Sequence, residues 1–132
     1  GEWSKTIRSW TLPGIPESIQ VTSTSTSNTL TWNPVRGATG YDIEIQGNSV
    51  NVGSSPTFTD TDVNSNTQRT YRVRAKNSSG AGKWTDIIAK TTLPDIPQNL
   101  YGIPKDTQII LMWDSVAGAR EYELEIDDQT II

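Results

Sequence analysis

An internal repeat constrains the fold of this chain more than any other feature of its sequence. Residues 1–51 align with residues 82–132 at an offset of 81 without a gap, and 17 of the 51 aligned pairs are identical. Many identical pairs are aromatic or apolar residues of the kind that fill protein cores, among them Trp3/Trp84, Trp32/Trp113, Val35/Val116, Tyr41/Tyr122 and Ile45/Ile126. Self-similarity at a fixed period is the signature of a structural unit repeated along a chain, and this unit is 81 residues long.

The repeat divides the chain into three segments. If each unit begins near a Leu-Pro pair, residues 1–12 are the last strand of a preceding unit and residues 13–94 form a complete unit. Residues 95–132 are then the first strands, three at most, of a following, truncated unit. Isolated strands expose unpaired edges and apolar faces. We therefore expect each flank, where it is ordered, to be covered by a neighbouring copy of the chain or by further repeats.

Turn-forming Gly, Pro and Asn residues separate short stretches in which apolar and polar residues alternate. Leu30 and Trp32 share one face of their stretch, as do Tyr41, Ile43 and Ile45 in the next. A period of two with one polar face is typical of an antiparallel sheet packed on one side. The pattern predicts an all-β, two-sheet antiparallel sandwich. Its seven strands are expected near residues 17–24, 28–33, 40–46, 49–52, 57–61, 68–77 and 84–92.

Four motifs follow one another along the complete unit. They are a Pro-containing opening, a strand with a core Trp, a Gly-Tyr strand and a Tyr-x-Val-x-Ala-x-Asn strand: Leu12-Pro13-Gly14-Ile15-Pro16, Leu30-Thr31-Trp32, Gly40-Tyr41-Asp42-Ile43 and Tyr71-Arg72-Val73-Arg74-Ala75-Lys76-Asn77. In these motifs the unit resembles a fibronectin type III domain, and Gly82-Lys83-Trp84-Thr85 is similar to the bacterial, tandem-repeat type. The resemblance implies an immunoglobulin-like sandwich, a fold that hosts many unrelated functions.

One position departs from the family pattern. Fibronectin type III domains usually have a Tyr two residues before the position of Tyr71, and its hydroxyl braces the corner that leads into the strand. This chain has Arg69 there. We expect either that Arg69 replaces the Tyr through a guanidinium–carbonyl hydrogen bond or that other groups brace the corner.

The residue types that most enzymes need are missing. The chain has no Cys and no His, so it lacks a thiol nucleophile, the usual general base and the commonest zinc ligands. Residues 60–66 alternate oxygen-bearing side chains as a calcium loop does, but Gly and Glu are missing at the sixth and twelfth positions of such a loop. We therefore predict no enzyme activity, no catalytic residues, no cofactor and no metal site.

The charge and hydropathy of the chain argue against two classes of partner. A formal net charge of −4 provides no basic cluster for nucleic acid. No apolar run approaches the roughly 20 residues that cross a bilayer, so membrane insertion is not expected. Arg72, Arg74 and Lys76 form a basic row on one predicted strand, and we expect them to pair with Asp42 and Glu44 across the sheet.

The candidates for a binding surface are among the five Trp residues. Trp32 and Trp113 lie on the apolar side of their strands and are predicted core residues. Trp3 and Trp84 stand where the last strand of a unit begins, and Trp10 lies close to the linker. These three could cap the open end of a sandwich, contact a neighbouring module or stack on a sugar ring.

Three hypotheses for function follow. The leading one is a structural spacer or interaction module in a repeat-built protein of the bacterial surface or extracellular space, whose partners are neighbouring modules or copies of the same chain. Prolines in the linker Thr92-Leu93-Pro94-Asp95-Ile96-Pro97 favour a semi-rigid string of modules. The second is a polysaccharide-binding accessory module of a secreted enzyme or adhesin. The third is a subunit of a surface filament in which strands of one chain complete a domain of the next.

Overall fold

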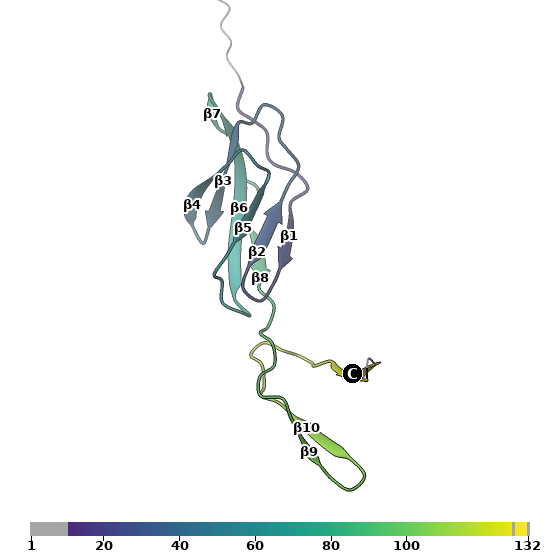
Figure 1. Cartoon of the computed structure of the whole chain (residues 1–132). Helices are drawn as coiled ribbons and strands as arrows, with labels where there is room; N and C mark the ends of the chain where they lie inside the picture. The colour runs from purple at the N-terminus through teal and green to yellow at the C-terminus, as the bar shows by residue number, and fades with distance from the viewer. Residues whose placement is uncertain (1–10, 128, 132) are drawn as a thin grey trace, which may run out of the picture.

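The complete repeat unit is a sandwich of two antiparallel sheets. The computed structural model describes residues 11–127 and 129–131, and in these residues there are twelve strands and no helix (Figure 1). The first eight strands belong to the unit: β1 Gln20–Ser23, β2 Asn28–Thr31, β3 Gly40–Ile45, β4 Asn48–Gly53, β5 Thr57–Asp60, β6 Gln68–Asn77, β7 Gly80–Ala81 and β8 Ile88–Thr91. One sheet has the order β1-β2-β5, and the other has the order β4-β3-β6-β7 with β8 also paired to β6. The predicted all-β sandwich is confirmed.

The core lies between the two sheets and is built from the alternating apolar residues. Trp32 is 4% exposed, as its place on the apolar face predicts. Its ring meets that of Tyr41 edge to face, with centroids 5.3 Å apart. Such a pair contributes about 0.5–1.5 kcal/mol beyond the burial of its area. The buried core residues are Leu30, Trp32, Tyr41, Ile43, Tyr71, Val73 and Ala75.

The last strand of the unit is shorter than its sequence pattern predicts. The alternation predicts a strand over residues 84–92, whereas β8 covers only Ile88–Thr91. At Thr85 the backbone amide still donates to the Val73 carbonyl, but the Val73 amide donates to the Thr85 hydroxyl at 3.0 Å and not to a backbone carbonyl. Because this side chain replaces one rung of the ladder, regular pairing begins only at β8. The two-residue strand β7 was not predicted at all.

The described residues of the segment 95–131 contain four strands, whereas three at most were expected. They are β9 Tyr101–Pro104, β10 Ile109–Met112, β11 Leu124–Ile126 and β12 Gln129–Ile131. The fourth forms because the chain turns back at Asp127, which has a φ of 52°, just as Gln46 with a φ of 50° turns β3 into β4. Beyond the linker, β9 and β10 form a hairpin that extends away from the sandwich (Figure 1).

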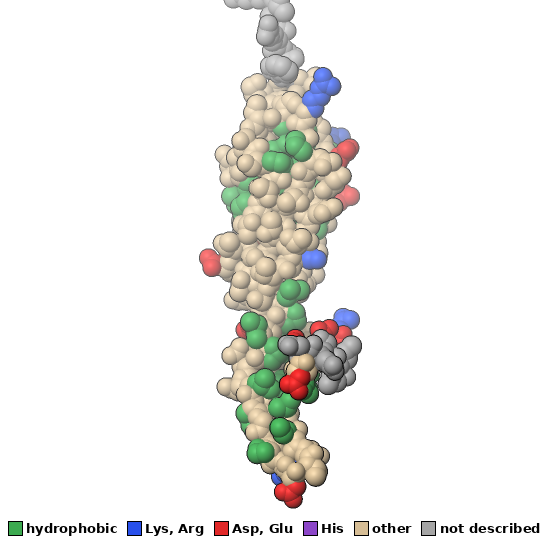
Figure 2. Space-filling model, turned by 45° about the vertical axis from the view of Figure 1, so that its right-hand side comes forward, with side chains coloured by type: hydrophobic (Ala, Val, Ile, Leu, Met, Phe, Trp, Pro, Cys, Tyr) green, Lys and Arg blue, Asp and Glu red, His purple; other side chains and the backbone are tan. Residues whose placement is uncertain are grey.

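The local geometry of the first half of the unit recurs in this following segment. Leu111 pairs with Gly102 as Leu30 pairs with Val21. The rings of Trp113 and Tyr122 meet edge to face at 5.5 Å, much as their equivalents do. Here, however, Trp113 is only half-buried. Apolar side chains gather on the surface of this segment (Figure 2), and the most exposed of them are Ile96, Leu100 and Ile109.

Candidate functional site

Trp84 lies on the outer face of the larger sheet, beneath two arginines. The Cζ atoms of Arg72 and Arg74 stand 4.8 Å and 4.4 Å from the centroid of its ring. Both arginines come from β6, where they alternate with the buried residues Tyr71 and Val73. The side chain of Trp84 is therefore half-buried on a flat sheet face and does not cap the open end of the sandwich. Each cation–π contact at such a site contributes about 0.5–1 kcal/mol.

The same arginines are held from the other side by two carboxylates of β3. The register of the two strands sets Glu44 opposite Arg72 and Asp42 opposite Arg74. Arg72 donates two hydrogen bonds to Glu44, at 2.9 Å and 2.8 Å, while Asp42 accepts from Arg74 at 3.0 Å and from Lys76 at 2.7 Å. The predicted pairing of the basic row with the acidic row is confirmed.

The pairing shifts the pKa values of two of these groups. Burial by itself raises the pKa of Asp42, but the hydrogen bonds from Lys76 and Arg74 outweigh it and hold this pKa below its ordinary value of 3.8. Hydrogen bonding to Glu44 raises the pKa of Arg72. The two carboxylates and three cations of this face are therefore held together in fixed ion pairs.

The other two Trp candidates are Trp3 and Trp10. Trp3 and Trp10 lie outside the residues that the structure describes, so the prediction that they contact a ligand or a neighbouring module stays open. Trp84 is the equivalent of Trp3 at the offset of 81, which is the reason both were expected to have one role.

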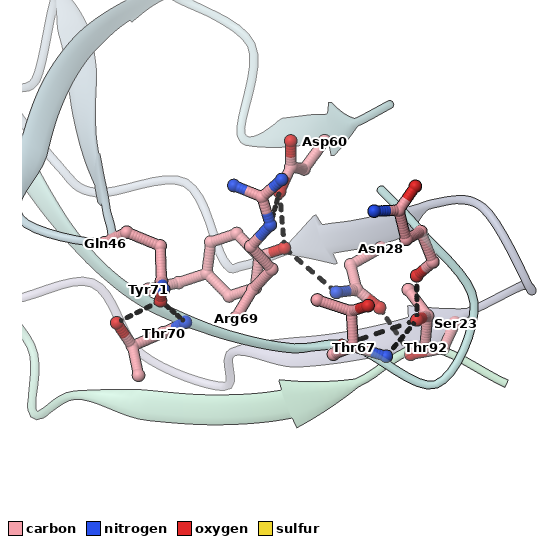
Figure 3. A network of polar contacts seen from close by, with 10 residues as sticks. Ser23, Asn28, Gln46, Asp60, Thr67, Arg69, Thr70, Tyr71 and Thr92 are labelled. Carbon is pink, nitrogen blue, oxygen red and sulfur yellow. Dashed lines mark hydrogen bonds and ion pairs between the residues drawn. The ribbon is translucent and has the colours of Figure 1, made fainter. Parts of the chain in front are cut away.

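A second site, at the junction of the last strand and the linker, was not predicted from the sequence. Thr92 is 2% exposed, and its hydroxyl donates to the Asn64 carbonyl at 2.6 Å while it accepts from the Thr67 amide at 2.9 Å (Figure 3). The next residue, Leu93, donates its amide to the Thr24 carbonyl at 2.9 Å and accepts from the Asn66 amide at 3.1 Å. The start of the linker is thus tied to two loops of the unit. We call this set of hydrogen bonds the linker clamp.

The corner before β6 is braced mainly by the hydroxyl of Tyr71. Tyr71 is 1% exposed, and its hydroxyl donates to Asp60 at 2.7 Å and accepts from the Asn28 amide at 2.9 Å (Figure 3). The Nε atom of Arg69 lies 4.0 Å from the same Asp60 carboxylate. Of the two alternatives for this corner, bracing by other groups is the one that the structure shows.

In the acidic stretch over residues 60–66, polar groups make hydrogen bonds within the sandwich, and one side chain is buried in it. Asp60 accepts the Tyr71 hydroxyl, Val63 is buried, and the carbonyl of Asn64 belongs to the linker clamp. In the described part of the chain, no cluster of three acidic, His or Cys side chains could hold a metal ion. No helix in the described part of the chain is long and apolar enough to cross a membrane.

Comparison with known proteins places this architecture in a family. The family model described as "Fibronectin type III domain" matches residues 14–91. Among solved structures, the crystal structure of FN3tt superposes with a TM-score of 0.57 at 22% identity, over 64% of this chain and 98% of that one. This likeness shows the shared fold.

Two curated relatives contain similar sequence within much longer chains. The Kelch domain-containing protein SSO1033 of Saccharolobus solfataricus is 36% identical over 111 residues, which span 76% of this chain and 15% of that protein. Exoglucanase B of Cellulomonas fimi is 27% identical over 122 residues, which span 80% of this chain and 11% of that protein. With its sandwich, its core Trp–Tyr pair and the family-model match over most of the complete unit, the chain belongs to the fibronectin type III domain family.

Proposed function

We propose that this chain serves as a non-catalytic spacer and interaction segment of a repeat-built protein of the bacterial surface or extracellular space. The observation that carries the proposal is the linker clamp. A spacer must hold its neighbours at a set distance, and a freely jointed linker cannot do this. Here the backbone amide and the carbonyl of Leu93 are both bonded to the unit, so free rotation can begin only beyond that residue.

The few residues that follow the clamp are themselves restricted. Pro94 and Pro97 each fix one backbone dihedral angle, and the Ile96 amide donates to the Asp95 carboxylate at 2.8 Å. The flexible part of the connection is therefore very short. Support for a non-catalytic role comes from the outer sheet face, where Asp42 and Glu44 are fully engaged by cations.

The experiment that tests the spacer is a measurement of backbone motion in the linker. We expect ¹⁵N relaxation of the Leu93 amide to give an order parameter near that of the rigid backbone, about 0.85. The substitution Thr92→Val keeps the side-chain shape but removes the hydroxyl, so it should lower the order parameters of Leu93 and Asp95. Thr92→Ser keeps the hydroxyl and is the matched control. A Leu93 order parameter below about 0.6 in the unaltered chain would refute the spacer.

A second candidate function is polysaccharide binding, and the similarity to exoglucanase B favours it. Sugar rings stack on exposed aromatic faces. For a sugar to stack on Trp84, the guanidinium group of Arg72 or Arg74 would have to move off the indole ring. The test is acrylamide quenching of Trp fluorescence with and without soluble polysaccharides, in the unaltered chain and in Trp84→Leu. Protection by one glycan that disappears in Trp84→Leu would place binding ahead of the spacer role. Quenching that no glycan alters leaves the spacer as the better account.

A further inference from the structure

Two hollows of nearly equal size lie at equivalent places in successive repeats. The first hollow, of about 260 Å³, is lined by Gly14, Ile15, Glu17 and residues 33–36. The second hollow, of about 270 Å³, is lined by Asp95, Ile96, Gln98 and residues 114–117. Each of these residues of the second hollow is the equivalent, at the offset of 81, of one in the first.

The same backbone hydrogen bonds and turns, which we call the frame, surround both hollows. In the first hollow the Asn33 amide donates to the Glu17 carbonyl at 3.0 Å, and in the second the Asp114 amide donates to the Gln98 carbonyl at the same distance. Behind each hollow a tyrosine hydroxyl accepts a valine amide, at 2.9 Å from Val35 and at 2.8 Å from Val116. The turns that close the two frames have matching glycines with φ values of 81° and 80°.

The two hollows differ in one respect. Ser65, from the complete unit, also lines the second hollow, whereas the described residues that line the first all come from its own frame. The neighbouring Asn66 side chain lies so close to Gly118 that a methyl group there would overlap it, while the equivalent Gly37 has no atom near enough to meet such a methyl. The second hollow is thus seated against the loop between β5 and β6 of the preceding unit.

The loop that reaches the second hollow is the loop that belongs to the linker clamp. Asn64 accepts the Thr92 hydroxyl, and the Asn66 amide donates to Leu93. These bonds fix the loop to the start of the linker, close to the point where the next repeat begins. The identical triplet Thr11-Leu12-Pro13 stands at the equivalent place before the first hollow.

We propose that the first hollow is a docking surface for the loop equivalent to residues 64–66 of another fibronectin type III module of this type, joined on its N-terminal side. The occupant is a polar Asn-Ser-Asn loop, and its third side chain covers Gly37 as Asn66 covers Gly118. Glu17 and Arg36 stand where the second hollow has Gln98 and Ala117, so the docked amide groups meet an added acceptor and an added donor. This contact would fix the orientation of successive modules, and it rests on the proposed spacer function.

The test uses a chain in which residues 13–93 are duplicated in tandem, so that Leu93 of the first copy is followed by Pro13 of the second. The chain has no native Cys, so spin labels attached after Gln68→Cys in the first copy and Gln20→Cys in the second report one distance between modules. Both positions are exposed and lie on strands. We expect a single narrow distance distribution.

The substitution Asn66→Gly separates docking from rigidity of the linker alone. It removes the docking side chain and tolerates the φ of 49° at this position. In the first copy it should abolish the narrow distribution. In the second copy, where the loop faces away from the labelled junction, it is the matched control and should leave the distribution unchanged. A narrow distribution that the first-copy substitution does not alter overturns the docking but leaves the spacer intact. A broad distribution in the parent duplicated chain overturns the docking as well, and the Leu93 order parameter then reports separately on the spacer.

Discussion

The hydroxyl of Tyr71 should contribute strongly to the stability of the sandwich, because it makes two hydrogen bonds from a buried ring. The substitution Tyr71→Phe removes only this atom from a side chain that is 1% exposed. Two bonds are lost, one to the Asp60 carboxylate at 2.7 Å and one from the Asn28 amide at 2.9 Å. A hydrogen bond to a charged group contributes about 1.5–3 kcal/mol, and a buried donor left without a partner costs about 1–3 kcal/mol. Because part of the Asp60 carboxylate stays accessible to water, we expect a loss of about 2–4 kcal/mol at pH 7.

The assay is urea unfolding followed by Trp fluorescence, with Tyr41→Phe as the matched control. The Tyr41 hydroxyl is also on a buried ring, but it makes one neutral bond, accepted from the Val35 amide at 2.9 Å. Its removal should cost about 1 kcal/mol. Equal losses in the two variants would contradict the reasoning, since the charged acceptor and the buried Asn28 belong only to Tyr71.

The pH dependence gives a second check on Tyr71. Burial and then the hydrogen bond to Asp60 raise the pKa of Tyr71 from 10.0 to about 12. The phenol is neutral when protonated, so a raised pKa in the folded state means that unfolding favours loss of the proton. The contribution of Tyr71 is therefore complete below pH 10 and declines as the pH rises toward 12. The stability difference between the unaltered chain and Tyr71→Phe should shrink over that interval, and a constant difference would refute the assignment.

Two further substitutions test the ion pairs of the outer face and the contact between Gly82 and the Pro13 carbonyl. Asp42→Asn weakens the pairing with both of its cations and should cost about 1–2 kcal/mol after allowance for solvent screening, measured by urea unfolding. Since the pKa of Asp42 is lowered from 3.8, its contribution is present above that pH and is lost as the pH falls below it, so the two chains should become equally stable in acid. Gly82→Ala would place a methyl against the Pro13 carbonyl oxygen, whereas Gly14→Ala meets no atom. Thermal unfolding should show a lower midpoint for Gly82→Ala than for Gly14→Ala. Equal midpoints would mean that the backbone at Pro13 can shift to make room for the methyl group.

Much of the sandwich could be predicted because period-two alternation is a local signal. Trp32 and Tyr71 are buried as the alternation requires, and the ladder between Glu44 and Arg72 follows once β3 and β6 are taken as neighbours. Residues that the offset of 81 relates also form matching backbone turns, such as those at Gly37 and Gly118.

The linker clamp and the Tyr71 brace could not be predicted, because both depend on how distant segments approach one another. Nothing in the Thr91-Thr92 pair indicates which hydroxyl is buried, and the partners of Thr92 are 25 and 28 residues away. The position of Trp84 was missed for a similar reason. Its place just before the last strand suggested the end of the sandwich, but the Thr85 hydroxyl interrupts the ladder, and Trp84 turns onto the arginines of the outer face.

The linker clamp also determines how the unit would carry a pulling force. Leu93 is bonded to Thr24, which follows β1 of one sheet, and to Asn66, which precedes β6 of the other. Tension applied through the linker is therefore divided between both sheets before it reaches the pairing of β8 with β6. A module anchored in this way resists stretching with its two layers together, and β8 is not peeled alone from the edge of its sheet.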